Sequence, residues 1–199
     1  GFVNVEGEKM SKSIGNIRLV HDLKSQYSGE VLRLTLLSAH YRQPLNWTKE
    51  IINQNSKMLD RFYRSLKDLQ DVEITSEKLS NEVMKSFLDD LNTPKVLAEL
   101  NTLSNKLSLA NKEEKINIKN NLIAAGKILG ILGEDPDVWL GYNQSANPEK
   151  EEIEGLINQR NEARRDKDFK LADEIRHKLK IKGIEIEDTK NGTIWRKDS

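Results

Sequence analysis

The chain of 199 residues contains no cysteine. This absence excludes a disulfide framework and any thiolate metal site, and it fits a reducing compartment, so we expect a cytoplasmic protein. The three histidines, His21, His40 and His177, are far apart in the sequence, and no two have the short spacing of metal ligands on one helix. We therefore predict no metal site in these residues.

Long apolar runs and an excess of one charge are also missing. No run of about 18 apolar residues occurs, and the start of the chain lacks the apolar core of a secretory signal, so we expect no membrane partner. Basic and acidic residues number 32 each, which gives a formal net charge of zero. This balance argues against broad electrostatic binding of nucleic acid. It leaves room for a partner that is read through a few placed contacts.

Aromatic residues are scarce, at 6% of the chain against 32% charged residues. The core must therefore be aliphatic and largely helical. Apolar residues recur at spacings of three and four along four stretches, which predicts amphipathic helices near 48–69, 76–91, 93–107 and 113–132. Such helices with short connections pack best as an antiparallel bundle.

Single residues set the expected ends of these elements. We place helix N-caps at Thr48 and Thr93, with Pro94 in the first turn, and a helix stop at Gly133. Shorter elements are expected before the bundle: a strand at 2–5, helices at 21–26 and 29–39, and a turn at 41–47.

The end of the chain has a different pattern. Two charged amphipathic helices are expected at 149–166 and 169–182, followed by alternating strands at 184–189 and 193–196. The dipeptide Asn191–Gly192 between the strands is a strong hairpin signal. The predicted fold class is mainly α: an antiparallel helical bundle, then a small α+β domain made of two helices and a β-hairpin.

The hairpin sequence also predicts a register. If Asn191 and Gly192 form the turn, Asp188 faces Trp195 and Glu187 faces Arg196. Asp188 then lies at the rim of an apolar face, where a carboxylate needs a hydrogen-bond partner or a ligand. A structural bond to a helix terminus or to the Trp195 indole and a role in ligand binding both stay open.

The most informative motif is Lys9-Met10-Ser11-Lys12-Ser13, followed closely by Gly15–Asn16. Two lysines three residues apart, among small hydroxyl residues, predict a mobile cationic loop that closes over a polyphosphate. Ammonium groups there neutralise the charge that builds on phosphoryl oxygens as a nucleophile attacks. The plain alternative is a solvated loop, because lysine and serine are common in this chain.

The chain resembles the cysteinyl-tRNA synthetase family, from the KMSKS loop of that class I family to its C-terminus. Several separate segments carry the resemblance in the same order: 9–13, 36–47, 89–94, 160–164, 167–169, 172–173, 183–184, 187–189 and 192–196. The resemblance implies five parts. These are the tail of the catalytic domain at 1–20, a connective stem-contact-like segment at 21–47, a helical bundle at 48–134, a linker at 135–148 and an anticodon-binding domain at 149–199.

The resemblance also implies an activity. The family forms cysteinyl-adenylate from cysteine and ATP, and then transfers cysteine to its tRNA. The HIGH motif of the family is missing here, so the chain is not expected to be catalytic alone. Its implied partners are cysteine tRNA and the catalytic domain of the same enzyme, where the family holds its zinc ion. We expect a monomer.

Residue roles follow from the same resemblance. Lys9 and Lys12 match the catalytic loop lysines, and Ser11 and Ser13 join them in binding ATP, with Lys12 the better candidate for the transition-state phosphates. Four further residues match positions that contact the GCA anticodon: Arg164, Phe169, Asp173 and Asp188. Arginine donates twice to guanine, carboxylates accept from the amino groups of cytosine and adenine, and an aromatic ring stacks on a base.

Weaker candidates and two alternatives remain. Arg42 and Lys49 are candidates for phosphate contacts in the segment after the loop. One alternative is a helical adaptor that binds protein partners through its bundle. Another is the corresponding part of a different class I synthetase, such as the methionine enzyme, which shares the lysine loop.

Overall fold

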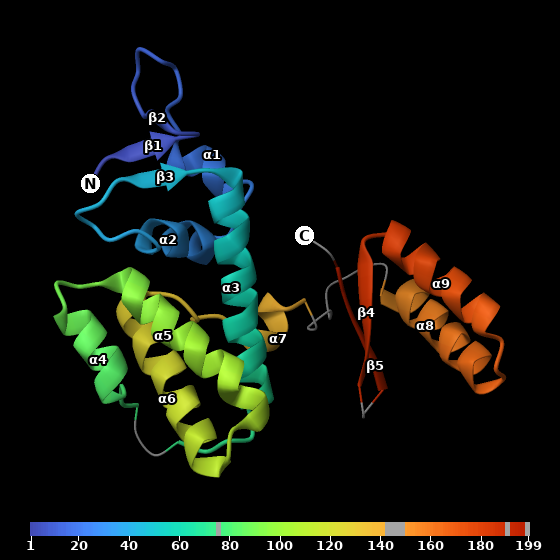
Figure 1. Ribbon diagram of the computed structural model, residues 1–199. Coiled ribbons are helices and arrows are strands. Elements are labelled where there is room, and N and C mark those ends of the chain that lie inside the picture. The colour runs from blue at the N-terminus through green and yellow to red at the C-terminus, as the bar shows by residue number, and fades with distance from the viewer. Residues whose placement is uncertain (75–76, 142–149, 190–191, 198–199) are drawn as a thin grey trace. The chain divides into compact units, whose positions relative to one another are not determined.

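The computed structural model describes residues 1–74, 77–141, 150–189 and 192–197 (Figure 1). The chain divides into two compact units, Gly1–Asp135 and Pro136–Ser199. The described residues are mainly helical, with two small sheets, and the prediction of a mainly α chain that ends in two helices and a β-hairpin is confirmed.

A three-stranded sheet opens the first unit. Strand β1 (Val3–Val5) lies between antiparallel β2 (Glu8–Lys9) and parallel β3 (Leu45–Trp47). The prediction of a turn throughout 41–47 was wrong at its end, because β3 is a strand there. A three-residue strand whose partner lies about forty residues away leaves almost no local pattern. Leu45 and Trp47 face the core, and each is 7% exposed.

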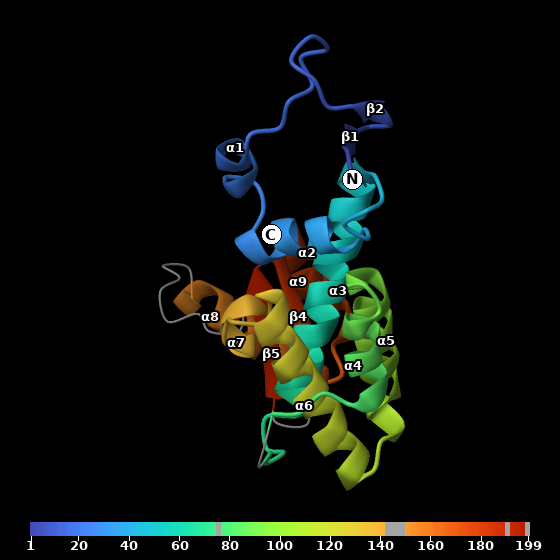
Figure 2. The same ribbon diagram turned by 90° about the vertical axis from the view of Figure 1, so that its left-hand side faces the viewer.

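Two helices, α1 (Val20–Lys24) and α2 (Gly29–Leu37), lie between β2 and β3 in the chain, and four further helices follow β3. The four are α3 (Lys49–Asp68), α4 (Asn81–Leu88), α5 (Thr93–Lys106) and α6 (Lys112–Leu129), and a 3-10 turn, Leu107–Leu109, follows α5. Figures 1 and 2 show α3, α5 and α6 side by side, and α2 packs on α3. The core among them is aliphatic with a few rings, and includes Leu59, Phe62, Tyr63, Val83, Leu100, Ile118 and Leu122.

The caps of these helices test the expected ends. Thr48 accepts a hydrogen bond from the Ile51 amide, as predicted for an N-cap. The N-cap of α5 is Asn92 rather than Thr93, whose hydroxyl instead donates to the Leu37 carbonyl at 2.7 Å. The prediction of Thr93 as the N-cap was therefore wrong. Its hydroxyl is engaged by the Leu37 carbonyl, and the side-chain oxygen of Asn92 accepts from the Lys95 amide instead.

Two other predicted helix ends, the start of α4 and the end of α6, were also wrong. Helix α4 begins after Ser80, five residues later than expected near 76, and Ser80 caps it through the Val83 amide. Helix α6 ends at Gly130, not at Gly133. Gly130 has φ 68°, a left-handed conformation that suits glycine at a helix end. Gly130 lies inside the expected stretch 113–132, because Leu132 continues the apolar spacing beyond the true end of the helix.

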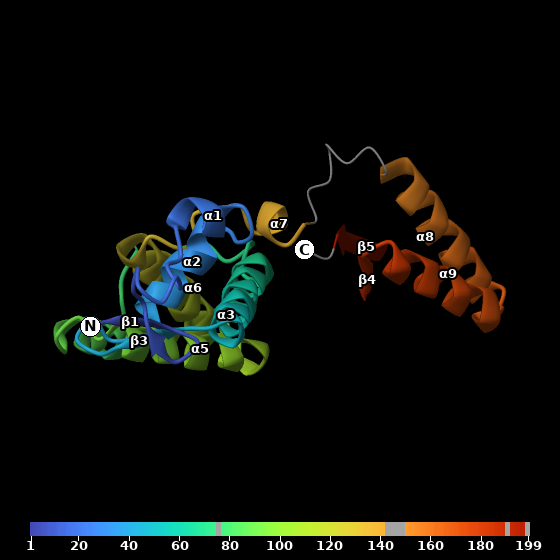
Figure 3. The same ribbon diagram turned by 90° about the horizontal axis from the view of Figure 1, so that it is seen from above.

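The second unit contains α7 (Pro136–Trp139), α8 (Lys150–Arg165), α9 (Phe169–Ile181), β4 (Ile184–Thr189) and β5 (Gly192–Lys197). Figures 1 and 3 show α8 and α9 side by side, and α9 also contacts β4. One apolar cluster joins the two helices to the hairpin; it consists of Ile153, Leu156, Ile157, Ile175, Leu179, Ile184 and Trp195, with Ile186 at its edge.

The predicted hairpin register was wrong by two residues. The structure pairs Asp188 with Thr193, Ile186 with Trp195 and Glu185 with Arg196. Gly192 pairs with Thr189 as the first residue of β5, and the expected turn residue Asn191 lies outside the described residues. A shift of two keeps every side chain on its predicted face, because the pleat also repeats every two residues. Asp188 therefore still shares a face with Trp195.

Candidate functional site

The lysine loop extends beyond the sheet between β2 and α1 (Figures 1 and 2). The side chain of Asn16 joins its two limbs: Oδ1 accepts from the Ser11 amide at 2.8 Å, and Nδ2 donates to the Lys9 carbonyl at 3.3 Å. Gly15, with φ 73°, supplies a turn at which its amide donates to the Lys12 carbonyl. The sequence alone placed Gly15–Asn16 next to the lysine motif but did not predict these hydrogen bonds across the loop.

The two loop lysines have different surroundings. The Lys9 ammonium lies 4.4 Å from the centroid of the Phe2 ring, where it makes a cation–π contact. The Lys12 side chain is exposed and makes no hydrogen bond or ion pair with any residue that the structure describes. The hydroxyl oxygens of Ser11 and Ser13 lie 3.2 Å apart beside it. Lys12 is therefore the cation that is available to an anionic ligand.

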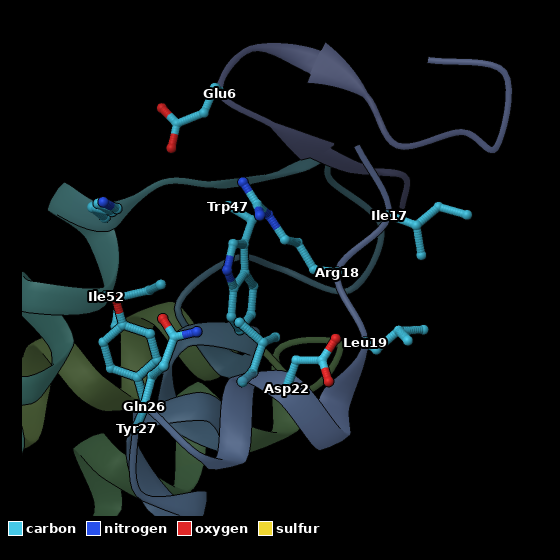
Figure 4. Close-up of a pocket in the computed structure, with 11 residues that line it drawn as sticks. Glu6, Ile17, Arg18, Leu19, Asp22, Gln26, Tyr27, Trp47 and Ile52 are labelled. Carbon is cyan, nitrogen blue, oxygen red and sulfur yellow. The ribbon is translucent and has the colours of Figure 1, made fainter. Parts of the chain in front are cut away.

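A pocket of about 140 Å³ lies beside the chain segment that leaves this loop (Figure 4). It is smaller than typical ligand pockets of about 300–1,000 Å³. The buried Trp47 ring lies at its centre, and its charged lining consists of two acids and two bases, namely Glu6, Asp22, Arg18 and Lys49. These formal charges cancel, so the pocket around Lys49 offers no excess of positive charge to a phosphate.

Arg42 already has an acidic partner. Its Nε donates to Asp90 Oδ2 at 2.7 Å, and the Tyr41 hydroxyl donates to Asp90 Oδ1 at 2.7 Å. The hydrogen bond from Tyr41, followed by that from Arg42, lowers the pKa of Asp90 from its ordinary value. Asp90 and Leu91 both have φ 52°, so this cluster holds a turn in the left-handed region. The arrangement joins the 36–47 and 89–94 segments, a structural role.

The second unit contains a cluster of charged residues around Asp188. The Arg160 guanidinium donates to both carboxylate oxygens of Asp188, at 2.9 and 2.8 Å. The Thr193 hydroxyl donates to Oδ1 at 2.8 Å, and Arg164 Nη1 donates to Oδ2. We call these four residues the Asp188 cluster. The hydrogen bond from Arg160, with smaller contributions from Thr193 and Arg164, holds the pKa of Asp188 well below its usual range.

The elements of the second unit explain how this cluster forms. Arg160 and Arg164 are one helical turn apart on α8, so both side chains project from the same face toward β4. Asp188 pairs with Thr193 across the two strands, which brings the hydroxyl next to the carboxylate. The cluster therefore depends on one helix face and one strand pair.

The turn between α8 and α9 lies next to these residues in the sequence. Lys167, with φ 61°, ends α8 in the left-handed region, and the Asp168 amide donates back to the Ala163 carbonyl at 2.8 Å. Asp168 then caps α9 through the Leu171 amide. Phe169, the first residue of α9, is 62% exposed and available for stacking.

Of the four residues predicted for the anticodon, the structure brings Arg164 and Asp188 into direct contact. Asp173 lies on α9, close enough for its charge to contribute to the raised pKa of Arg160, whose main cause is the hydrogen bond to Asp188. Phe169 begins α9 with its ring exposed, and no hydrogen bond, ion pair or ring contact joins it to the other three in the part of the chain that the structure describes.

Sequence reasoning missed Arg160 as a site residue. It also expected a helix terminus or the Trp195 indole as the structural partner of Asp188, which was wrong, because the partner is an arginine side chain. A signal was present. Arg160 continues the buried helix face of Ile153, Leu156 and Ile157, and the whole residue is only 4% exposed. A cation in such a position requires an acid nearby.

Neither a metal centre nor a membrane span is present in the part of the chain that the structure describes. No three histidine, aspartate or glutamate side chains there are grouped so as to hold a metal ion. No helix there is both long and apolar enough to cross a bilayer. The described residues therefore do not fit a zinc ion.

Two family models match the chain. Residues 1–57 match a model described as the tRNA synthetases class I (C) catalytic domain, and residues 148–196 match the cysteinyl-tRNA ligase anticodon binding domain. Together these matches cover more than half of the chain. The first includes the lysine loop and the second includes the Asp188 cluster.

Three curated proteins illustrate the similarity over the whole chain. The cysteine–tRNA ligases of Parvibaculum lavamentivorans, Rhodospirillum rubrum and Maricaulis maris are 48%, 44% and 40% identical to the chain, over 98–99% of its length. The chain spans only 43–44% of the length of these relatives.

Proposed function

Because the chain belongs to the cysteine–tRNA ligase family, we propose that it is the C-terminal, tRNA-binding part of such an enzyme and that it reads the anticodon of cysteine tRNA. The observation that carries this proposal is the Asp188 cluster. It gathers a guanidinium and a carboxylate at the surface, within the segment that matches the anticodon-binding model and close in sequence to an exposed aromatic ring.

The residue types in this region suit an unpaired triplet of bases. Arg164 supplies a planar donor pair for guanine, and the carboxylates of Asp173 and Asp188 accept from the amino groups of cytosine and adenine. Phe169 stacks on a base that is turned out of the loop. A few contacts of this kind agree with a chain whose net charge is zero.

The lysine loop has a separate role in the proposed enzyme. Lys12 donates to the phosphates of ATP as cysteinyl-adenylate forms, and Lys9, Ser11 and Ser13 complete the contact. The support for Lys12 is its exposed ammonium, which has no partner among the described residues. The rest of the active site, including any zinc ion that binds the substrate thiol, belongs to the catalytic domain of the same enzyme, so these residues alone are not catalytic.

The same proposal covers the organisation of the chain. Residues 1–20 are the tail of the catalytic domain, 21–47 a connective segment, 48–134 the helical bundle, 135–148 a linker and 149–199 the anticodon-binding domain. The enzyme acts as a monomer in the cytoplasm.

A binding assay with the 199-residue chain tests the proposal. Cysteine tRNA competes with the same transcript carrying a methionine anticodon, in a filter assay. We expect at least about tenfold tighter binding of the matched transcript, since correct base contacts contribute about 1–3 kcal/mol each. Equal binding of the two transcripts, or a preference for the methionine anticodon, would reject the proposal. A separate pull-down in which the chain retains a protein partner and no tRNA would also reject it.

Variants of exposed residues make this assay specific. Arg164→Gln should remove most of the preference for the matched transcript, because it removes the donor pair for guanine. Arg165→Gln is the matched control, since Arg165 is the next residue on α8, is exposed, and has only a 3.8 Å ion pair with Glu162. Asp188→Asn is a poor first variant, because Asp188 also neutralises a buried arginine.

A further inference from the structure

The Asp188 carboxylate is fully occupied in the structure. Oδ1 accepts from Arg160 and Thr193, and Oδ2 accepts from Arg160 and Arg164. A carboxylate offers about four acceptor positions in all. An amino group of a base therefore finds no acceptor position at Asp188 until one of the present donors leaves.

We propose that Arg164 leaves Asp188 when the anticodon binds, and that Arg160 stays in place as the residue that positions the Asp188 carboxylate for the base. This inference rests on the proposed function of the Asp188 cluster. It assigns different tasks to two arginines one helical turn apart, and it adds Arg160 to the residues that determine specificity.

Exposure distinguishes the two arginines. The Arg160 side chain is 5% exposed and donates to both oxygens of Asp188, whereas the Arg164 side chain is 49% exposed and donates to one. Moving Arg160 away would leave a buried guanidinium without its counterion, which is strongly unfavourable. Arg164 can exchange Asp188 for water or a base at little loss, because exposed ion pairs contribute only about 0–1 kcal/mol.

Thr193 is not a candidate for the group that leaves. Its residue pairs with Asp188 across the hairpin, so the backbone ladder fixes the hydroxyl beside the carboxylate. The hydroxyl has a single proton, and Asn161 Oδ1, 3.1 Å away on α8, is the other acceptor within its reach. If the proton turned to Asn161, the Thr193 oxygen would still lie 2.8 Å from Asp188 Oδ1 and would block that acceptor position. Arg160, Thr193 and the β4–β5 pair thus form a fixed frame, and Arg164 is the movable member.

The exchange couples the reading of two bases. When Arg164 turns from Asp188 to guanine, it also frees an acceptor position on Asp188 Oδ2 for an amino group of another base. Each event makes the other easier, because the same Arg164–Asp188 contact must break for both. A transcript that lacks the guanine should therefore lose part of the contact at Asp188 as well.

Arginine NMR on the full chain tests the exchange directly. The guanidinium signals of Arg160 and Arg164 are identified from Arg160→Lys and Arg164→Lys variants, and then followed during addition of an anticodon stem–loop RNA with the GCA triplet. We expect the Arg164 signals to shift while those of Arg160 keep their slow exchange with solvent.

Each outcome of this titration has a separate meaning. Binding of the RNA with unchanged Arg164 signals, or with loss of the slow Arg160 signals, overturns the exchange but keeps the proposed function. No difference in binding between the GCA stem–loop and one with a scrambled triplet overturns the proposed function, and the exchange with it.

Base discrimination tests Arg160 as a positioning residue. Arg160→Lys keeps the positive charge but loses the pair of hydrogen bonds that Arg160 donates to the two Asp188 oxygens. We expect the penalty for replacing cytosine by uracil, or adenine by hypoxanthine, to fall about tenfold at the position that Asp188 reads, with the guanine penalty less changed. Arg165→Lys is the control and should leave every penalty unchanged. If Arg160→Lys weakens all transcripts equally, the role of Arg160 is structural only and the positioning claim fails.

Discussion

The lysine loop and the Asp188 cluster place their positive charges in opposite ways. In the loop, the Lys12 ammonium has no partner among the described residues, and the backbone is held instead by the Asn16 amide. In the cluster, both arginines are already paired with one carboxylate. In the proposed enzyme, the loop offers an unpaired charge to a charged ligand, whereas the cluster, whose charges are already paired, exchanges a contact when it binds.

The loop and the cluster should therefore respond differently to mutation. Removing an unpaired cation at the surface alters the binding of a ligand and leaves folding unchanged. Removing one member of a buried, hydrogen-bonded pair alters folding first. The comparison therefore predicts that variants of the loop change function alone, and that variants at the centre of the cluster change stability as well.

The largest expected effect is on catalysis, through Lys12. In a chimera that places this chain in the Parvibaculum lavamentivorans ligase, Lys12→Ala should reduce ATP–pyrophosphate exchange about 100- to 1,000-fold, as removal of a transition-state donor does. Lys9→Ala should have a smaller effect, because its ammonium already contacts Phe2. If the exchange rate of Lys12→Ala stays within twofold of that of the parent chimera, the proposed role of the loop is wrong. Equal urea midpoints of the variant and the parent chimera would show that folding is unchanged.

The next largest effect is on the stability of the second unit. Asp188→Asn should lower its free energy of unfolding by about 1–3 kcal/mol, because the buried Arg160 guanidinium loses its charged partner, while Asp188 itself is 43% exposed. Hydrogen exchange of peptides from α8 in increasing urea measures this change. Asp173→Asn is the control, since Asp173 is exposed, and should change stability by less than about 0.5 kcal/mol. Equal effects of the two variants would contradict the comparison.

The pH dependence of that stability difference follows from the lowered pKa of Asp188, whose main cause is the hydrogen bond from Arg160. A carboxyl with a lowered pKa in the folded state stabilises the fold fully above its unfolded pKa of about 3.9, and this contribution is lost as the pH falls through the folded pKa. The difference between the parent and Asp188→Asn should therefore be constant from about pH 5 to 8 and shrink below about pH 4. Urea midpoints of both chains across this range measure it.

The smallest expected effect is on the shape of the loop. Asn16→Ala removes the two hydrogen bonds that join the loop limbs, each of which contributes about 0.5–1.5 kcal/mol. The loop should open locally, so trypsin should cleave after Lys12 several-fold faster while the urea midpoint stays the same. Asn4→Ala, in the neighbouring strand β1, serves as the control. Unchanged cleavage would show that Asn16 does not hold the loop.

Local patterns were enough for much of this fold. The helix periodicity, the Thr48 cap and the β-hairpin were all readable, because each depends on residues a few positions apart. Strand β3 and the true cap of α5 were not, because a distant strand and the Leu37 carbonyl determine them. The predicted hairpin register was wrong because Asn191 and Gly192 were both taken as turn residues. In the structure, Gly192 is already the first residue of β5 and pairs with Thr189.

In the candidate site, too, a contact between residues far apart in the sequence was the part that sequence analysis missed. The resemblance pointed to Arg164 and Asp188, and the structure places them in contact. Arg160 was not assigned to the site, although it continues the apolar face of α8, because its acidic partner lies 28 residues away on a strand. A buried arginine at a core position is a signal that can be searched for in other sequences.

Photo-crosslinking from the anticodon shows whether the Asp188 cluster region is where the anticodon binds. A cysteine tRNA with thioguanine as the first anticodon base is bound to the 199-residue chain and irradiated, and the attached peptide is sequenced. We predict attachment within α8, the α8–α9 turn or the β4–β5 hairpin, and loss of that attachment in Arg164→Gln. Attachment confined to Gly1–Asp135, or attachment that Arg164→Gln leaves unchanged, would contradict it.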